Sequence, residues 1–138
     1  MRSEKAKMLA GDLYVAQDPV LIADRVRASA WMERYNGSLS PDDEQRTMLE
    51  ELLASLGDGT IVRPPFYCDY GYNIALGRDV FLNFGCIMLD AVEISIGDLT
   101  QIGPGVQILT ADHPRAGVHS SCPGSRSAIT RSSVPEPW

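Results

Sequence analysis

The 138-residue sequence has little that would tie it to a metal, a membrane or a nucleic acid. It holds only two histidines, and its three cysteines form no CxxC pair, a pattern that lacks metal-ligand spacing and favours reduced thiols in the cytoplasm. No apolar run approaches the roughly 18 to 20 residues of a membrane span, and the start has no apolar core of a signal peptide. The net charge of -6 disfavours non-specific binding to a phosphate backbone. We therefore expect a cytoplasmic protein without metal, nucleic-acid or membrane partners.

Residues 1–58 are predicted to form a module of three helices. Ser3 is placed to cap a short helix that runs to Leu9. The pair Asp18-Pro19 is a strong start signal for a second helix, which Asn36-Gly37 ends. Its apolar residues recur at helical spacing: Leu21, Ile22, Val26, Ala30, Trp31 and Tyr35.

A third helix is expected to begin at Ser40-Pro41, with Asp43 at the reciprocal position of a capping box. We expect it to run until Gly57 stops it. Its apolar stripe would consist of Met48, Leu49, Leu52, Leu53 and Leu56.

Residues 59–115 show a repeat with a period of six. The repeating aliphatic positions are Leu76, Leu82, Met88, Ile96, Ile102 and Ile108, with Ile94-Ser95 as a two-residue insertion between the two trios. A period of six fits neither a helix nor a simple strand, and it predicts a triangular coil in which each flat side uses one hexad. We expect about two coils, glycines that help the chain turn the corners, and residues 60–73 as extended chain over the end of the coil.

Residues 116–138 break this repeat. Continuing the phase from Ile108 gives Pro114, Ser120, Arg126 and Ser132, none of which can fill the interior of a coil. We expect this tail to be irregular, and we interpret it as the product of a frameshift or a truncated gene.

Several stretches resemble the maltose, galactoside and nodulation-type sugar O-acetyltransferases of the hexapeptide-repeat family. They are EKAKMLAGDLY, LIADRVRASAWMERYN, PPFYCDYGYNIALG, FLNFGCIMLD, IGDLTQIGPGVQI and TADHP, which span residues 4 to about 114. The resemblance implies an α+β chain in which the helical module precedes a short left-handed parallel β-helix. It also implies a homotrimer, acetyl-CoA as co-substrate, and a sugar acceptor of the maltose, glucose or galactoside class.

The resemblance assigns the role of general base to His113, in the stretch TADHP. A neutral imidazole can take the proton of a sugar hydroxyl as that hydroxyl attacks a thioester. Asn83 matches a position near the acetyl group and the acceptor, where its amide would donate to an oxyanion or orient the hydroxyl; a turn role would also explain it. Asp69 matches a contact to sugar hydroxyls, although a solvated turn residue has the same pattern.

Two further acids are weaker candidates for contacts to the substrate. Asp18 is already explained as a helix cap, and the family acid could align with Ala16 instead. Asp90 is a candidate of the same kind. Arg25 and Arg27 are expected to be charges on a helix face.

Other functions remain to be weighed against an active sugar O-acetyltransferase. In the resembled family most contacts to acetyl-CoA come from later hexads, which residues 116–138 do not continue. The main alternative is therefore a non-catalytic remnant of such an enzyme. A zinc carbonic anhydrase of the same fold needs three histidines, and here His119 in the tail would be only the second. Serine acetyltransferases fit less well, because the helical module is of the sugar type.

Overall fold

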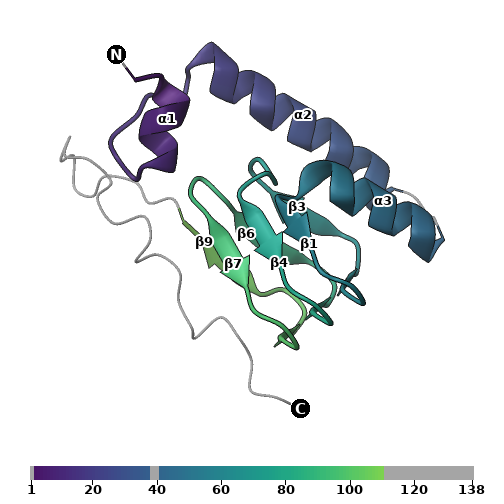
Figure 1. Ribbon diagram of the computed structural model, residues 1–138. Helices are drawn as coiled ribbons and strands as arrows, with labels where there is room; N and C mark the ends of the chain where they lie inside the picture. Colours follow the sequence, from purple (N-terminus) through teal and green to yellow (C-terminus); the bar gives the residue numbers. More distant parts are fainter. Residues whose placement is uncertain (1, 38–40, 111–138) are drawn as a thin grey trace.

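The computed structural model describes residues 2–37 and 41–110, in which three helices precede nine short strands (Figure 1). The helices are α1 (Glu4–Leu9), α2 (Pro19–Asn36) and α3 (Asp42–Leu52). The strands are β1 (Ser55–Leu56), β2 (Ile61–Val62), β3 (Phe66–Cys68), β4 (Ile74–Leu76), β5 (Phe81–Leu82), β6 (Cys86–Leu89), β7 (Ile94–Ile96), β8 (Gln101–Ile102) and β9 (Gln107–Leu109). The expectations for residues 111–138, including the irregular tail, lie outside the described residues. None of the described helices has the length and apolar character needed to cross a membrane.

The ends of the first two helices are capped as the sequence predicts. The Ser3 side chain accepts the N–H of Ala6, and the Asp18 side chain accepts the N–H of Val20. Helix α2 ends at Asn36, with Gly37 as its C-cap. Helix α3 has Pro41 at its N-cap and no side-chain cap bond there, and the expected cap Ser40 lies outside the described residues.

The buried face of α2 differs from the predicted stripe. Its buried residues are Leu21, Asp24, Ala28, Trp31 and Tyr35. By contrast, Ile22 is 39% and Val26 61% exposed. Both sets follow helical spacing, and only the set that faces α3 and the coil is covered, so spacing alone does not select it.

The nine strands form a coil of three parallel sheets, with strand orders β1-β4-β7, β2-β5-β8 and β3-β6-β9. Each turn of the coil takes twenty residues, so Leu56 pairs with Leu76 and Leu76 with Ile96. The coil therefore has three turns, not two, and it begins at Ser55 rather than at residue 59. Residues 60–73 supply β2 and β3 of its first turn instead of an extended cover.

Two local expectations change with this register. Helix α3 ends at Leu52, because Ser55–Leu56 pair with β4 instead of continuing the helix to Gly57. The two-residue insertion that interrupts the period of six was expected at Ile94-Ser95. It lies instead in the corner at residues 90–93, since Ile94 and Ser95 belong to β7.

The glycines at one corner serve stacking more than turning. Gly57, Gly77 and Gly97 follow one another at intervals of twenty residues, and none of them has a positive φ. A methyl group at Gly57 would overlap the backbone of Gly77 and Arg78 in the next turn. The left-handed backbone occurs two residues later in each turn, for example at Asp79, where φ is 53°. Gly57 and Gly77 are therefore needed for the close approach of the next turn, whereas a methyl group at Gly97 would meet no atom within 4 Å.

A continuous core joins the helices to the coil. The Trp31 ring stacks on Tyr35 with 4.6 Å between centroids and meets Phe66 of β3 edge-on at 6.3 Å. The Tyr35 hydroxyl donates to the carbonyl oxygen of Val62 at 2.6 Å. Because large aromatic side chains dominate core energetics, this packing fixes the helical module on the first turn of the coil.

Candidate functional site

The corner of the coil between β3 and β4, residues 69–73, contains the predicted site residue Asp69 and contacts a second one, Asp90. Asp69 follows β3 directly, and Asp90 occupies the corresponding corner one turn later, since Cys68 pairs with Met88. Thr110, the last described residue, follows at the same corner in the third turn, since Leu89 pairs with Leu109. The corners of three successive turns thus lie in one column.

Asp90 lies beneath this corner rather than on its surface. Its side chain is 0% exposed, and its carboxylate accepts four backbone N–H groups. The donors are Asp69 at 3.2 Å and Tyr70 at 2.9 Å to Oδ1, and Gly71 at 2.8 Å and Asn73 at 3.1 Å to Oδ2. Burial raises the pKa of Asp90 to about 6, although these hydrogen bonds favour the charged form. The geometry therefore differs from the substrate contact expected of Asp90, because the acceptor positions of its oxygens are occupied by backbone.

Asp69 is half-buried, and a guanidinium acts on it electrostatically. Burial raises the pKa of Asp69, and the charge of Arg25 opposes that rise. Arg25 donates from Nη1 to the Tyr70 hydroxyl at 2.9 Å and from Nη2 to the carbonyl oxygen of Ala16 at 2.8 Å. Arg25 is thus a bridge between α2 and the corner, and not the surface charge that the sequence suggested.

A second set of polar contacts ties the same corner to α1 and α2. The Tyr72 hydroxyl donates to Asp24 at 2.8 Å, and the Lys5 ammonium lies 3.1 Å from the same oxygen. Burial alone would raise the pKa of Asp24, but the hydrogen bond from Tyr72 and the charge of Lys5 lower it. The rings of Tyr70 and Tyr72 stack at 5.3 Å. The corner is therefore held from the helical side as well as from the coil.

Asn83 lies at a different corner, between β5 and β6. Its Oδ1 accepts the N–H of Phe84 at 2.8 Å, and its backbone N–H donates to Ile102 at 3.0 Å. Within the described part of the chain, Nδ2 of Asn83 has no hydrogen-bond acceptor. The side chain therefore uses its oxygen locally and keeps its N–H donors available. Beside it, the Arg63 guanidinium lies over the Phe84 ring at 4.8 Å.

A single copy of the chain does not bring Asp69 and Asn83 together. Leu82 pairs with Val62, which puts Asn83 level with Arg63, six residues before Asp69. At about 3.3 Å per residue, one side of the coil therefore separates the two side chains by up to roughly 20 Å.

The remaining predicted residues are less informative. The Asp18 side chain accepts the N–H of Val20 at 3.0 Å, as a helix cap does. His113 lies outside the described residues, three positions after Thr110. Among the described residues, no group of three or more histidine, cysteine or acidic side chains is placed to hold a metal ion.

The sequence did not predict that Asp24 and Arg25 of α2 contact Tyr70 and Tyr72 of the corner. A signal was present in α2, because Asp24 and Arg25 lie three and four residues after the buried Leu21 and just before the buried Ala28. Charged residues at core spacing indicate a polar partner, which here is the pair of tyrosines.

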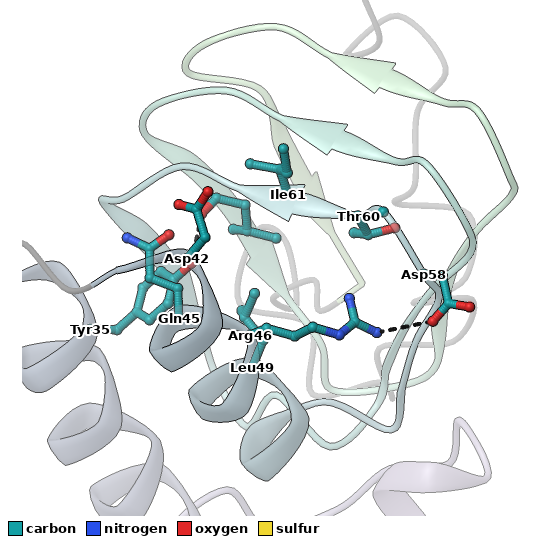
Figure 2. Close-up of a pocket in the computed structure, with 10 residues that line it drawn as sticks. Tyr35, Asp42, Gln45, Arg46, Leu49, Asp58, Thr60 and Ile61 are labelled. Atoms are coloured by element: carbon teal, nitrogen blue, oxygen red, sulfur yellow. Dashed lines mark hydrogen bonds and ion pairs between the residues drawn. The ribbon is translucent and has the colours of Figure 1, made fainter.

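A separate groove of about 280 Å³ lies between α3 and the first turn of the coil (Figure 2). Its polar groups are largely committed to the chain itself. Arg46 donates to the carbonyl oxygens of Gly57 at 3.2 Å and Leu56 at 3.3 Å and lies 3.6 Å from Asp58. The groove contains none of the predicted site residues.

Comparison with known proteins identifies the type of fold and capping segment. Residues 7–57 match the family model described as the maltose acetyltransferase hexapeptide capping motif. The nodulation protein L of Rhizobium meliloti (strain 1021) is 51% identical over 114 residues, which cover 82% of this chain and 62% of the relative. The chain thus spans less than two thirds of the length of that relative.

Solved structures give the same result. A maltose O-acetyltransferase from Clostridium difficile 630 superposes with a TM-score of 0.81 at 38% identity, covering 84% of this chain and 63% of the other. A hexapeptide-repeat acetyltransferase from Vibrio cholerae, complexed with acetyl coenzyme A, has a TM-score of 0.76 at 35% identity and covers 84% of this chain and 63% of its own. The fold is the left-handed parallel β-helix that the resemblance implied. The chain thus carries the capping motif of the maltose acetyltransferases and, over its described coil, has the fold of the hexapeptide-repeat acetyltransferases.

Proposed function

We propose that this chain takes part in the acetyl-CoA-dependent O-acetylation of a sugar hydroxyl, of the maltose, glucose or galactoside class. The observation that carries the proposal is the placement of Asp69. Its half-buried carboxylate feels the charge of Arg25 and lies in the same column of corners as Thr110, which precedes His113 by three positions. A carboxylate can accept hydrogen bonds from two hydroxyls at once, which suits a sugar.

The chemistry proposed for His113 is direct acyl transfer. The imidazole takes the proton of the acceptor hydroxyl while the hydroxyl oxygen bonds to the thioester carbon of acetyl-CoA. The tetrahedral intermediate then expels the CoA thiolate, which receives a proton, and the acetyl ester remains on the sugar. The oxyanion needs a donor in place, and the Nδ2 group of Asn83 would supply it or orient the attacking hydroxyl. Acetyl-CoA is supported as co-substrate by the structure of the Vibrio cholerae protein, whose complex contains it.

We place the reaction between neighbouring copies of the chain. Asp69 and Asn83 lie at different corners of the coil, too far apart to hold one acceptor within one copy. Copies packed side by side, as in a homotrimer, would put the Asn83 corner of one coil against the Asp69 corner of the next. The half-exposed Phe84 lies at the Asn83 corner, and the half-exposed Tyr67 lies in β3 on the side between the two corners. Both would pack in such a contact.

An assay of CoA release tests the proposal on the 138-residue chain. Maltose, glucose and a galactoside serve as acceptors, and the native mass in solution is measured on the same sample. We expect CoA release that depends on the sugar, together with the mass of three chains. No release with any acceptor above a His113→Ala control would favour the alternative, a non-catalytic protein.

A further inference from the structure

We infer that Asp90 is a positioning residue, which fixes the corner of the coil at residues 69–73 and thereby sets where Asp69 lies in the acceptor site. The anchoring rests on the hydrogen bonds of the structure. The consequence for the acceptor rests on the proposed function.

The contact is made by one buried carboxylate with nearly the whole corner. Four of the five backbone N–H groups of residues 69–73 donate to it, at 2.8 to 3.2 Å, two to each oxygen. The Asn73 side chain completes the contact in the opposite direction, because its Nδ2 donates to the backbone oxygen of Asp90 at 2.8 Å. A buried backbone N–H that loses its acceptor is costly, so the corner cannot shift while Asp90 stays in place.

Another corner of the same coil shows that this arrangement is specific. Asp98 also follows a strand, yet its Oδ1 accepts a single backbone N–H, from Arg78 at 2.8 Å. Its side chain is 51% exposed. Asp98 therefore offers a matched control, with the same residue type in the same coil but with one exposed hydrogen bond in place of four buried ones.

The anchored corner carries three side chains that face the helical module. Asp69 feels the charge of Arg25, Tyr70 accepts a hydrogen bond from Arg25, and Tyr72 donates one to Asp24. Fixing the backbone of this corner therefore fixes where the Asp69 side chain leaves the coil, next to the tyrosine that Arg25 binds.

The next turn repeats the device. The Thr110 hydroxyl donates to the carbonyl oxygen of Leu89 at 2.7 Å and accepts the N–H of Val92 at 3.1 Å. The third turn thus holds the corner that contains Asp90, as Asp90 holds the corner that contains Asp69. The column therefore fixes Thr110, the last described residue, relative to the corner that carries the carboxylate proposed to bind the sugar.

Amide hydrogen exchange tests the anchoring without any need for activity. Wild type, Asp90→Asn and Asp98→Asn are compared as full chains. We expect the amides of residues 69, 70, 71 and 73 to exchange at least tenfold faster in Asp90→Asn, beyond any change in the rest of the coil, and no such change in Asp98→Asn. Equal protection of the corner in wild type and Asp90→Asn would overturn the inference. If Asp90→Asn does not fold, Asn73→Ala keeps the carboxylate and removes one side of the contact, and a smaller acceleration at the same amides is expected; its absence would also overturn the inference.

A double-mutant cycle tests the consequence for the acceptor. The dissociation constants of maltose, glucose, methyl galactoside and acetyl-CoA are measured by calorimetry for wild type, Asp69→Asn, Asp90→Asn and the double variant. We expect Asp90→Asn to raise the dissociation constant of the sugar about tenfold, or about 1.4 kcal/mol, and to leave that of acetyl-CoA unchanged. In the Asp69→Asn background the added effect should be less than twofold, because Asp90 acts through Asp69. Fully additive effects would overturn the positioning role. If wild type binds none of the sugars, the proposed function fails, and the exchange experiment still decides the anchoring.

Discussion

The column formed by Gly57, Gly77 and Gly97 predicts that the same substitution has opposite effects at its two ends. In the first turn, a methyl group at Gly57 would overlap the carbonyl group of Gly77 and the amide nitrogen of Arg78. Both are backbone atoms, which cannot rotate away as a flexible side chain would. In the third turn, a methyl group at Gly97 meets no atom within 4 Å.

The magnitude follows from what must move at Gly57. Overpacking of a well-packed site costs about 1 to 3 kcal/mol. The displaced segment also carries the bond from the Gly57 N–H to the Leu76 oxygen at 2.9 Å and the bond from Arg46 to the Gly57 oxygen at 3.2 Å. Each of these contributes about 1 kcal/mol. We expect Gly57→Ala to lower the free energy of unfolding by about 2 to 4 kcal/mol, and Gly97→Ala to change it little or to raise it by up to about 1 kcal/mol, because alanine restricts the unfolded chain.

Urea unfolding followed by circular dichroism measures both variants against wild type at one protein concentration. A lower midpoint for Gly57→Ala with an unchanged slope, and a midpoint at or above that of wild type for Gly97→Ala, is the expected pattern. Equal midpoints for the two variants, or a larger loss for Gly97→Ala, would show that the turns are not stacked as closely as the structure has them.

Three further outcomes are expected. His113→Ala should lower any acetyl transfer about a hundred- to ten-thousand-fold, a change of roughly 3 to 5 kcal/mol in the barrier, and turnover equal to wild type would remove it from the mechanism. Asp69→Asn should raise the KM of the sugar, at a cost of about 1 to 3 kcal/mol, and leave that of acetyl-CoA unchanged; the reverse pattern would contradict its role. Because burial raises the pKa of Asp90 from 3.8 to about 6 on folding, the cost of burying its charge is absent at low pH and is fully present once the pH has risen through about 6. The stability of wild type relative to Asp90→Asn should therefore fall by about 2 kcal/mol between pH 4 and pH 7, and urea midpoints that run parallel over this range would refute the assignment.

The sequence predicts the coil well because its signal is local. A period of six depends only on spacing along the chain, and the burial of Leu76, Leu82 and Met88 inside the coil confirms it. The first turn was missed although Leu56, Val62 and Cys68 are also six residues apart. A cysteine in place of an aliphatic residue and the adjacent pair Pro64-Pro65 hid the phase, and only pairing with the next turn shows that these residues face inward.

For the candidate site, the sequence predicts less and the structure decides more. Residue type and motif singled out Asp69 and Asp90, but both are acids at a corner, and nothing along the chain distinguishes the one that faces solvent from the one that lies beneath backbone. That difference arises because a turn of twenty residues brings the Asp90 carboxylate under the N–H groups of the preceding corner.

The sequence by itself determined the helix caps at Ser3 and Asp18, the repeat and the chemical types available for the site, because each of these depends on neighbours within a few residues. The tertiary structure alone decided which face of α2 is buried, that Arg25 meets Tyr70, and that Asn83 and Asp69 lie at different corners. These features depend on contacts between residues twenty to fifty positions apart. Such contacts form only when the turns stack and the helices pack on them, because the free energy of burial is shared by all of the packed elements and is not encoded at any one position.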